Sequence, residues 1–161
     1  MFEEDLREWK KSEREFAIKL LANLSLDIKW IEFAPDWQFK PRDLKIKFKR
    51  NWTEYNKTFE VKTDGVFPRT WDVCFETQCN GVPSGIYSST ADVIVYKLWE
   101  NFYYQDRWRL LLALNKLPHE EKIWWDGNRS ELYIVKWEHM SDLFRKFTIS
   151  GYVLSTPKYV I

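Results

Sequence analysis

The chain has 161 residues, 45% hydrophobic and 30% charged, with a formal net charge of +1. This composition suits one globular domain and excludes a disordered chain, and the charge gives no overall attraction to nucleic acid. The two Cys, at 74 and 79, and the two His, at 119 and 139, do not make a zinc-finger or other four-ligand zinc set. Because the N-terminus is charged rather than signal-like, and no run approaches the ~18 apolar residues of a membrane span, we expect a cytoplasmic protein with no membrane partner.

The first predicted element is an amphipathic helix over residues 3–24, whose apolar stripe is interrupted by Glu13. Two strands follow, at 26–35 and 43–49. In the second strand apolar and polar residues alternate, which indicates that one face is buried and the other is wet. The buried face would carry Leu44, Ile46 and Phe48, and the wet face Asp43, Lys45, Lys47 and Lys49.

A polar hairpin at 51–57 leads to the next predicted strand, TFEVKTD at 58–64. Another alternating strand follows at 71–78. The loop at 80–92 has the turn residues, Ser/Thr and Asp that are expected where a strand gives way to a short helix. Residues 93–99 form a near-continuous apolar run, which is typical of a strand buried on both faces.

The remaining sequence is less definite: 107–117 suits a strand or a helix, 132–137 a strand, and 139–147 a short amphipathic helix. One long helix, several strands in hairpin-like succession, a short helix and another strand predict an α/β (α+β) fold. We expect a single domain over 1–161 with one central mixed β-sheet flanked by helices.

The strand at 58–64 carries the most informative residues, since Glu60, Lys62 and Asp64 occupy alternate positions and therefore share a face. The surrounding segment is basic: residues 40–62 hold eight Lys or Arg against three Asp or Glu. A phosphate backbone would be attracted there. The expected DNA-binding residues are Lys45, Lys47, Lys49, Arg50 and Trp52, the last being placed to stack on a base.

Hydrolysis of a phosphodiester needs carboxylates that hold one or two Mg²⁺ ions, together with a cation near the charge that develops on phosphorus. Asp43 at the start of one strand, with Glu60 and Lys62 on the next, would supply that set. The expected cofactor is therefore Mg²⁺ or Mn²⁺. An acidic-x-Lys triplet by itself is more often an exposed ion pair. The hypothesis of a metal site therefore depends on the order in which Asp43, Glu60 and Lys62 occur along the chain.

Asp43 with Glu60-Val61-Lys62 resembles the signature of the PD-(D/E)xK nuclease superfamily. The resemblance implies a restriction-endonuclease-like αβββαβ core, in which these residues bind Mg²⁺ and cut DNA. The run SEREFAIKLL in the first helix is similar to one in archaeal Holliday junction resolvases. There a glutamate completes the metal cluster, and Glu13 matches it.

A second resemblance is to small phage-type nucleases of the same superfamily. It rests on FEVKTD, on FETQ at 75–78 and on PSGIYSSTAD at 83–92. It implies a different set, with Asp64 as the metal aspartate and Glu76 and Gln78 at the acidic-x-Lys position. Sharing a face, Asp64 and Glu76 would also be able to join Asp43 and Glu60 in one metal cluster. The nuclease-like core spans about residues 3–98, and 99–161 is a C-terminal extension without a counterpart.

The sequence thus predicts a metal-dependent deoxyribonuclease, an endonuclease in preference to an exonuclease. Its catalytic residues would be Asp43, Glu60, Lys62 and Glu13, with DNA as partner and a homodimer as one option. The alternative is a non-catalytic nucleic-acid-binding or assembly protein on the same fold. A protein-interaction module that uses a Trp-rich surface is a third class.

Overall fold

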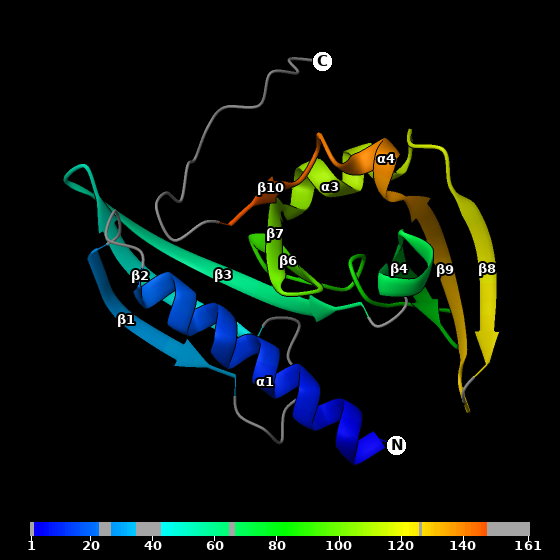
Figure 1. Ribbon diagram of the computed structural model, residues 1–161, viewed down its shortest axis with the longest axis horizontal. Coiled ribbons are helices and arrows are strands. Elements are labelled where there is room, and N and C mark those ends of the chain that lie inside the picture. The colour runs from blue at the N-terminus through cyan, green and yellow to red at the C-terminus, as the bar shows by residue number, and fades with distance from the viewer. Residues whose placement is uncertain (1, 23–26, 35–42, 65–66, 126, 148–161) are drawn as a thin grey trace.

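The computed structural model describes residues 2–22, 27–34, 43–64, 67–125 and 127–147, which form an α+β architecture (Figure 1). The elements in chain order are α1 (Phe2–Leu21), β1 (Asp27–Phe33), β2 (Leu44–Arg50), β3 (Thr53–Thr63), α2 (Phe67–Thr70), β4 (Asp72–Cys79), β5 (Val82–Pro83), β6 (Val93–Leu98), β7 (Asn101–Asp106), α3 (Arg107–Leu114), β8 (Glu120–Trp125), β9 (Arg129–Lys136), α4 (Trp137–Met140) and β10 (Arg145–Lys146). The predicted ends at 24, 26 and 35 lie outside the described residues.

The first sheet has the strand order β1-β2-β3-β6-β7-β10. Strands β1, β2 and β3 form an antiparallel meander, β6 lies parallel to β3, and β7 returns antiparallel to β6. Helix α1 lies across one face of the meander (Figure 1). The predicted alternation of β2 is confirmed, because Leu44, Ile46 and Phe48 are buried on the side of α1.

Helix α1 is held to this sheet by an apolar stripe and by polar contacts at one end. The Phe16 ring lies 5.8 Å from the ring of Phe59 on β3 and 5.4 Å from that of Phe102 on β7. Near the C-terminal end of β3, Thr63 donates a hydrogen bond to Ser12 (2.9 Å). The helix expected from residue 3 is confirmed, although it ends at Leu21.

The expectation of one central sheet is wrong, because the described strands form two. The second sheet has the order β5-β4-β9-β8 and lies beyond the end of β3 (Figure 1). Both edges of β3 are occupied, by β2 and by the parallel strand β6, so β4 has no place beside it and pairs with β9 instead. The segment after residue 98 therefore contributes strands to both sheets.

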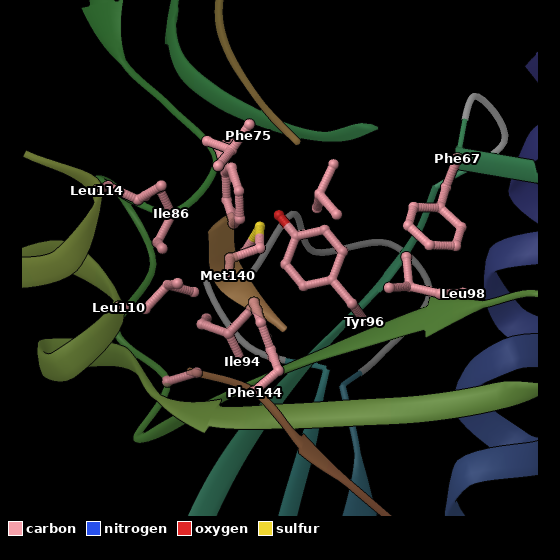
Figure 2. Packing of buried hydrophobic residues seen from close by; sticks show 13 residues of the cluster. Phe67, Phe75, Ile86, Ile94, Tyr96, Leu98, Leu110, Leu114, Met140 and Phe144 are labelled. Carbon is pink, nitrogen blue, oxygen red and sulfur yellow. The ribbon is translucent and has the colours of Figure 1, made fainter. Parts of the chain in front are cut away.

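A second apolar cluster fills the space between β6, β4, β9 and the helices α3 and α4. Figure 2 shows Tyr96 reaching from β6 into its middle, where its ring lies 5.2 Å from that of Phe75 on β4. The buried run at 93–99 is confirmed as strand β6, and the ambiguous segment at 107–117 begins with helix α3. No helix in the described part of the chain is long and apolar enough to span a membrane.

Two predicted short helices are absent. After β5 the chain forms a turn, in which Ser84 donates its backbone N–H to Thr77 (3.0 Å) and Arg107 binds the carbonyls of Ile86 and Tyr87. These contacts hold the turn against β4 and against the first residue of α3, in a conformation that is not helical. The helix expected at 139–147 is also wrong, because α4 ends at Met140 and the Phe147 N–H donates to Phe102 on β7 (2.7 Å).

Candidate functional site

Asp43 and Glu60 lie on the same face of the first sheet, the face away from α1. Leu44 pairs with Phe59, so residues 43 and 60 project to the side opposite these two buried residues. Asp43 continues the ladder by donating its backbone N–H to Phe59 (2.9 Å). Its carboxylate Oδ2 accepts a hydrogen bond from the Val61 N–H (2.6 Å). The side chain of Asp43 is thereby fixed beside Glu60.

The environment of the Asp43 carboxyl group favours its neutral, protonated form. Burial raises its pKa to about 6, the Val61 hydrogen bond opposes this rise, the negative charge of Glu60 adds to it, and the positive charge of Lys62 opposes it. A carboxyl group whose pKa is raised by burial and by a neighbouring carboxylate is a candidate for a functional site.

Glu60 is 6% exposed, although it is an acidic residue on a strand. Its Oε1 forms an ion pair with the ammonium group of Lys62, whereas its Oε2 is buried and accepts no hydrogen bond from the residues that the structure describes. Such an oxygen normally finds a partner, because leaving it unsatisfied costs about 1–3 kcal/mol or more. The structure therefore has an unfilled acceptor next to Asp43.

Asp64 is used differently, since both of its carboxylate oxygens accept backbone hydrogen bonds. Oδ1 accepts from the Phe67 N–H (3.0 Å) and Oδ2 from the Cys74 N–H (2.9 Å). These bonds tie the end of β3 to the start of β4, and so join the two sheets. Asp64 thus has a structural task that does not need a metal ion.

Glu76 and Gln78 lie on β4, in the second sheet, and both are partly buried. The carboxylate of Glu76 is close enough to the Tyr96 hydroxyl to affect its ionisation. Burial, followed by the charges of Asp64, Glu60, Cys74 and Glu76, raises the pKa of Tyr96 well above its usual range. The hydroxyl donates to the Cys74 carbonyl (3.4 Å).

Glu13 lies on α1, which packs against the other face of the sheet from Glu60 and Lys62. Its side chain is partly exposed. The neighbouring Glu15 forms an ion pair with Lys97 on β6 (2.6 Å) on this same side. The sheet therefore stands between α1 and the side chains of Glu60 and Lys62.

The expected DNA-binding residues do not all share one face. Lys45, Lys47 and Lys49 alternate with the core residues of β2 and project on the side of Asp43 and Glu60. Arg50 falls on the side of α1, where burial raises the pKa of the Tyr104 hydroxyl and the positive charges of Arg145 and Arg50 oppose the rise. Trp52 lies at the tip of the β2–β3 hairpin and is 92% exposed.

One exposed aromatic residue on this face, Trp30 on β1, has no counterpart in the sequence prediction. A β-bulge between Ile28 and Trp30 shifts the register, so that Ile28 and Ile31 pack against the core while Trp30 is 44% exposed. Simple alternation would put Ile28 and Trp30 on one face. No local signal in the sequence reveals the bulge.

The segment Pro83–Asp92 holds the strands together. Asp92 accepts hydrogen bonds from the Thr58 backbone N–H (2.8 Å) and hydroxyl (3.0 Å), which align the start of β6 with β3. Gly85 has a φ of +53° and passes so close to β4 that a Cβ atom would lie 2.4 Å from the Glu76 carbonyl oxygen. These residues have roles that the fold itself explains.

Asp43 and Glu60 are the residues that fit a divalent ion best, since both offer hard oxygen ligands and Glu60 Oε2 lacks a partner. In the described part of the chain, no group of three or more His, Cys, Asp or Glu side chains is positioned to hold a metal. Mg²⁺ is commonly held by one or two carboxylates together with water and substrate phosphates. The geometry thus suits a two-carboxylate site.

No family model, curated protein or solved structure matches this chain. The residues themselves therefore carry the functional argument.

Proposed function

We propose that the chain is a metal-dependent nuclease that hydrolyses DNA phosphodiester bonds, with Asp43, Glu60 and Lys62 as its catalytic residues. The observation that carries this proposal is the buried, unpartnered Oε2 of Glu60 on the same sheet face as Asp43, whose own pKa is raised to about 6. Burying two carboxylates side by side lowers the stability of the folded protein, because their negative charges repel each other. A bound cation would remove this repulsion.

The order of elements supports a restriction-endonuclease-like core as the finer description of the fold. Helix α1 is followed by the antiparallel strands β1, β2 and β3, and β6 then joins in parallel to β3. Asp43 precedes β2 and the Glu60–Lys62 pair lies on β3, in the order that the resemblance implies. One departure is the connection from β3 to β6, which carries the four-residue helix α2 and the strands β4 and β5 where the resemblance implies a single helix.

Asp43 and Glu60 would hold Mg²⁺ or Mn²⁺ through their carboxylate oxygens. When bound, such an ion polarises phosphoryl oxygens and lowers the pKa of coordinated water. Lys62, whose side chain is 37% exposed, carries a positive charge at the solvent side of Glu60. That charge would stabilise the negative charge that develops on phosphorus. The Val61 amide would fix Asp43, so that one ligand is preorganised before substrate arrives.

The test is DNA cleavage with purified protein, on a supercoiled plasmid and on a single-stranded circular DNA, in Mg²⁺ and in EDTA. We expect cleavage in Mg²⁺, none in EDTA, and a loss of at least about 100-fold in rate for Glu60→Gln and for Lys62→Ala. Thermal unfolding of each variant checks that the fold is kept. A folded Glu60→Gln variant that still cuts would overturn the assignment.

The chain offers a matched control in β8, which has the same acidic-x-Lys spacing. Glu120 and Lys122 form an ion pair (3.4 Å), but their side chains are 65% and 54% exposed. Exposed pairs of this kind contribute little. Glu120→Gln and Lys122→Ala should therefore leave cleavage unchanged, which would show that burial beside Asp43, and not the triplet, makes the site.

A non-catalytic nucleic-acid-binding or assembly protein is the second candidate. The ion pair between Glu60 and Lys62 favours it, because each group partly satisfies the other without a metal. Absence of cleavage on both DNA forms in Mg²⁺ and in Mn²⁺, with DNA binding retained, would support this alternative.

A further inference from the structure

The face of β1, β2 and β3 that bears Asp43 also carries two exposed tryptophans, each beside a lysine. Trp30 pairs in register with Lys47, and the ammonium group of Lys45 lies 5.9 Å from the centre of the Trp30 ring. The ammonium group of Lys49 lies 5.2 Å from the centre of the Trp52 ring. We call this surface the Lys/Trp face; it consists of Trp30, Lys45, Lys47, Lys49 and Trp52.

Trp52 occupies a backbone position that tryptophan does not favour. Arg50 and Thr53 pair across the hairpin, and the two residues between them, Asn51 and Trp52, have φ values of +46° and +68°. Two positive φ angles are the mark of a type I′ turn, in which Asn-Gly is the preferred sequence. A bulky residue in the left-handed region is strained. Since Trp52 is also 92% exposed, the hairpin gains little from its side chain.

We propose that the Lys/Trp face binds single-stranded DNA, with bases stacked on Trp30 and Trp52 and phosphates beside the lysines. The identity of the ligand as DNA rests on the proposed nuclease function. Each Trp and Lys pair would receive the two chemically distinct parts of one nucleotide, an aromatic base and an anionic phosphate. A duplex is disfavoured because its bases are stacked on one another and present no free ring to a tryptophan on a sheet.

Charge alone would not select this ligand. On the same face Asp27, Glu32 and Glu54 pair in register with the lysines, and Glu54 forms an ion pair with Lys47 (3.2 Å). Three carboxylates thus match the three lysines, so stacking must supply most of the affinity. We therefore expect a weak dependence of binding on salt, with a slope of about −2 or smaller in magnitude, as for up to three phosphates on a single strand.

The Lys/Trp face leads directly to the carboxylates. Lys45 is two residues from Asp43 on the same side of β2, a separation of about 7 Å along a strand. Trp52 directly precedes β3, and Glu60 lies eight residues further along the chain, about 26 Å away at the rise of an extended strand. A single strand that follows β2 from the hairpin tip would therefore reach Asp43 and Glu60.

The test is fluorescence anisotropy of a labelled oligo(dT), and of a duplex of the same length, in EDTA. We expect the wild-type protein to prefer the single strand, and Trp52→Gly to bind it about 5- to 150-fold more weakly. Because Trp52→Gly creates the favoured Asn-Gly turn, its Tm should equal or exceed that of the wild type. Trp30→Thr should also weaken binding, and Trp124→Thr, at a 61% exposed tryptophan on β8, should not.

The outcome separates this inference from the nuclease proposal, because binding is measured without metal and cleavage with it. Wild-type affinity in a folded Trp52→Gly variant, or equal or tighter binding to the duplex, would overturn the single-strand inference even if the protein cuts DNA. Conversely, Trp52-dependent binding without cleavage in Mg²⁺ would sustain the inference and count against the nuclease.

Discussion

The Oδ2 atom of Asp43 lies 2.6 Å from the backbone nitrogen of Val61, one residue from Glu60. This bond holds a carboxylate whose pKa is raised to about 6 by burial and by the charge of Glu60. The folded state consequently binds the Asp43 proton more tightly than the unfolded state does. Between pH 3.8, the ordinary value, and about pH 6, the contribution of this group to stability falls as pH rises.

Replacing Asp43 by Asn removes this ionisation, while the amide oxygen can still accept the bond from Val61. Without metal at pH 7, we expect Asp43→Asn to be more stable than the wild type by about 1 to 2 kcal/mol, since solvent at this partly exposed side chain weakens the penalty. The difference should shrink towards zero below the ordinary pKa. Urea unfolding from pH 4 to pH 7 measures it, and a difference that does not change with pH would contradict this account.

Divalent ions should stabilise the protein through the same pair of carboxylates. At ten times the Kd of Mg²⁺ or Mn²⁺ the gain is about 1.4 kcal/mol, or roughly 3 to 5 °C in Tm for a domain of this size. The gain should be larger at pH 7 than at pH 5, because Asp43 must lose its proton to bind the ion. Thermal melts with and without metal test this.

The stabilisation by metal should disappear in Glu60→Gln and persist in Glu54→Gln. Glu54 is an exposed carboxylate on the same strand and the same face as Glu60. An equal response of the two variants would indicate weak binding to surface carboxylates in general. A melting curve that metal leaves unchanged in the wild type would count against the site.

The turn at Gly85 should tolerate no side chain. Its φ of +53° disfavours other residues, and a Cβ would lie 2.4 Å from the Glu76 carbonyl oxygen, where the backbone of β4 cannot move away. We expect Gly85→Ala to lose about 3 to 5 kcal/mol of stability. Gly81→Ala is the matched control, with a φ of +78° and open space around it, and should cost about 1 kcal/mol. Chemical unfolding compares them, and equal losses would disprove the steric explanation.

Local pattern predicted which faces of β2 and of the C-terminal half of β3 are buried, because alternation follows directly from the geometry of an extended chain. Residues 53–57, predicted as part of a polar hairpin, belong to β3, and β7 and β8 were not predicted. Leu44, Ile46 and Phe48 are buried as expected, and Glu60 and Lys62 share the opposite face. The same alternation puts Arg50 on the side of Phe48, so grouping it with the lysines on charge alone missed its orientation.

Pairing between distant strands was beyond the reach of such patterns. The parallel contact of β3 with β6 depends on hydrogen bonds between Thr58 and Asp92, which lie 34 residues apart. That contact displaces β4 into the second sheet and leads Asp64 to bind the Cys74 amide. The sequence alone therefore favoured Asp43 but kept Asp64 as the alternative metal aspartate, although their carboxylates have different partners.

Asp64→Asn distinguishes the two candidate aspartates. An amide keeps one acceptor oxygen, so either the Phe67 or the Cys74 N–H would face another donor, and we expect a loss of about 2 to 3 kcal/mol. Provided that the assay temperature keeps the variant folded, its Mg²⁺-dependent cleavage should stay within a few-fold of the wild type, whereas Asp43→Asn should be inactive. Comparing the two variants by thermal melts and cleavage rates decides the matter. If the Asp64→Asn protein were stable but inactive, the metal-binding role would be assigned to Asp64 in place of Asp43. An acceptor that is needed only for structure cannot be removed without a loss of stability.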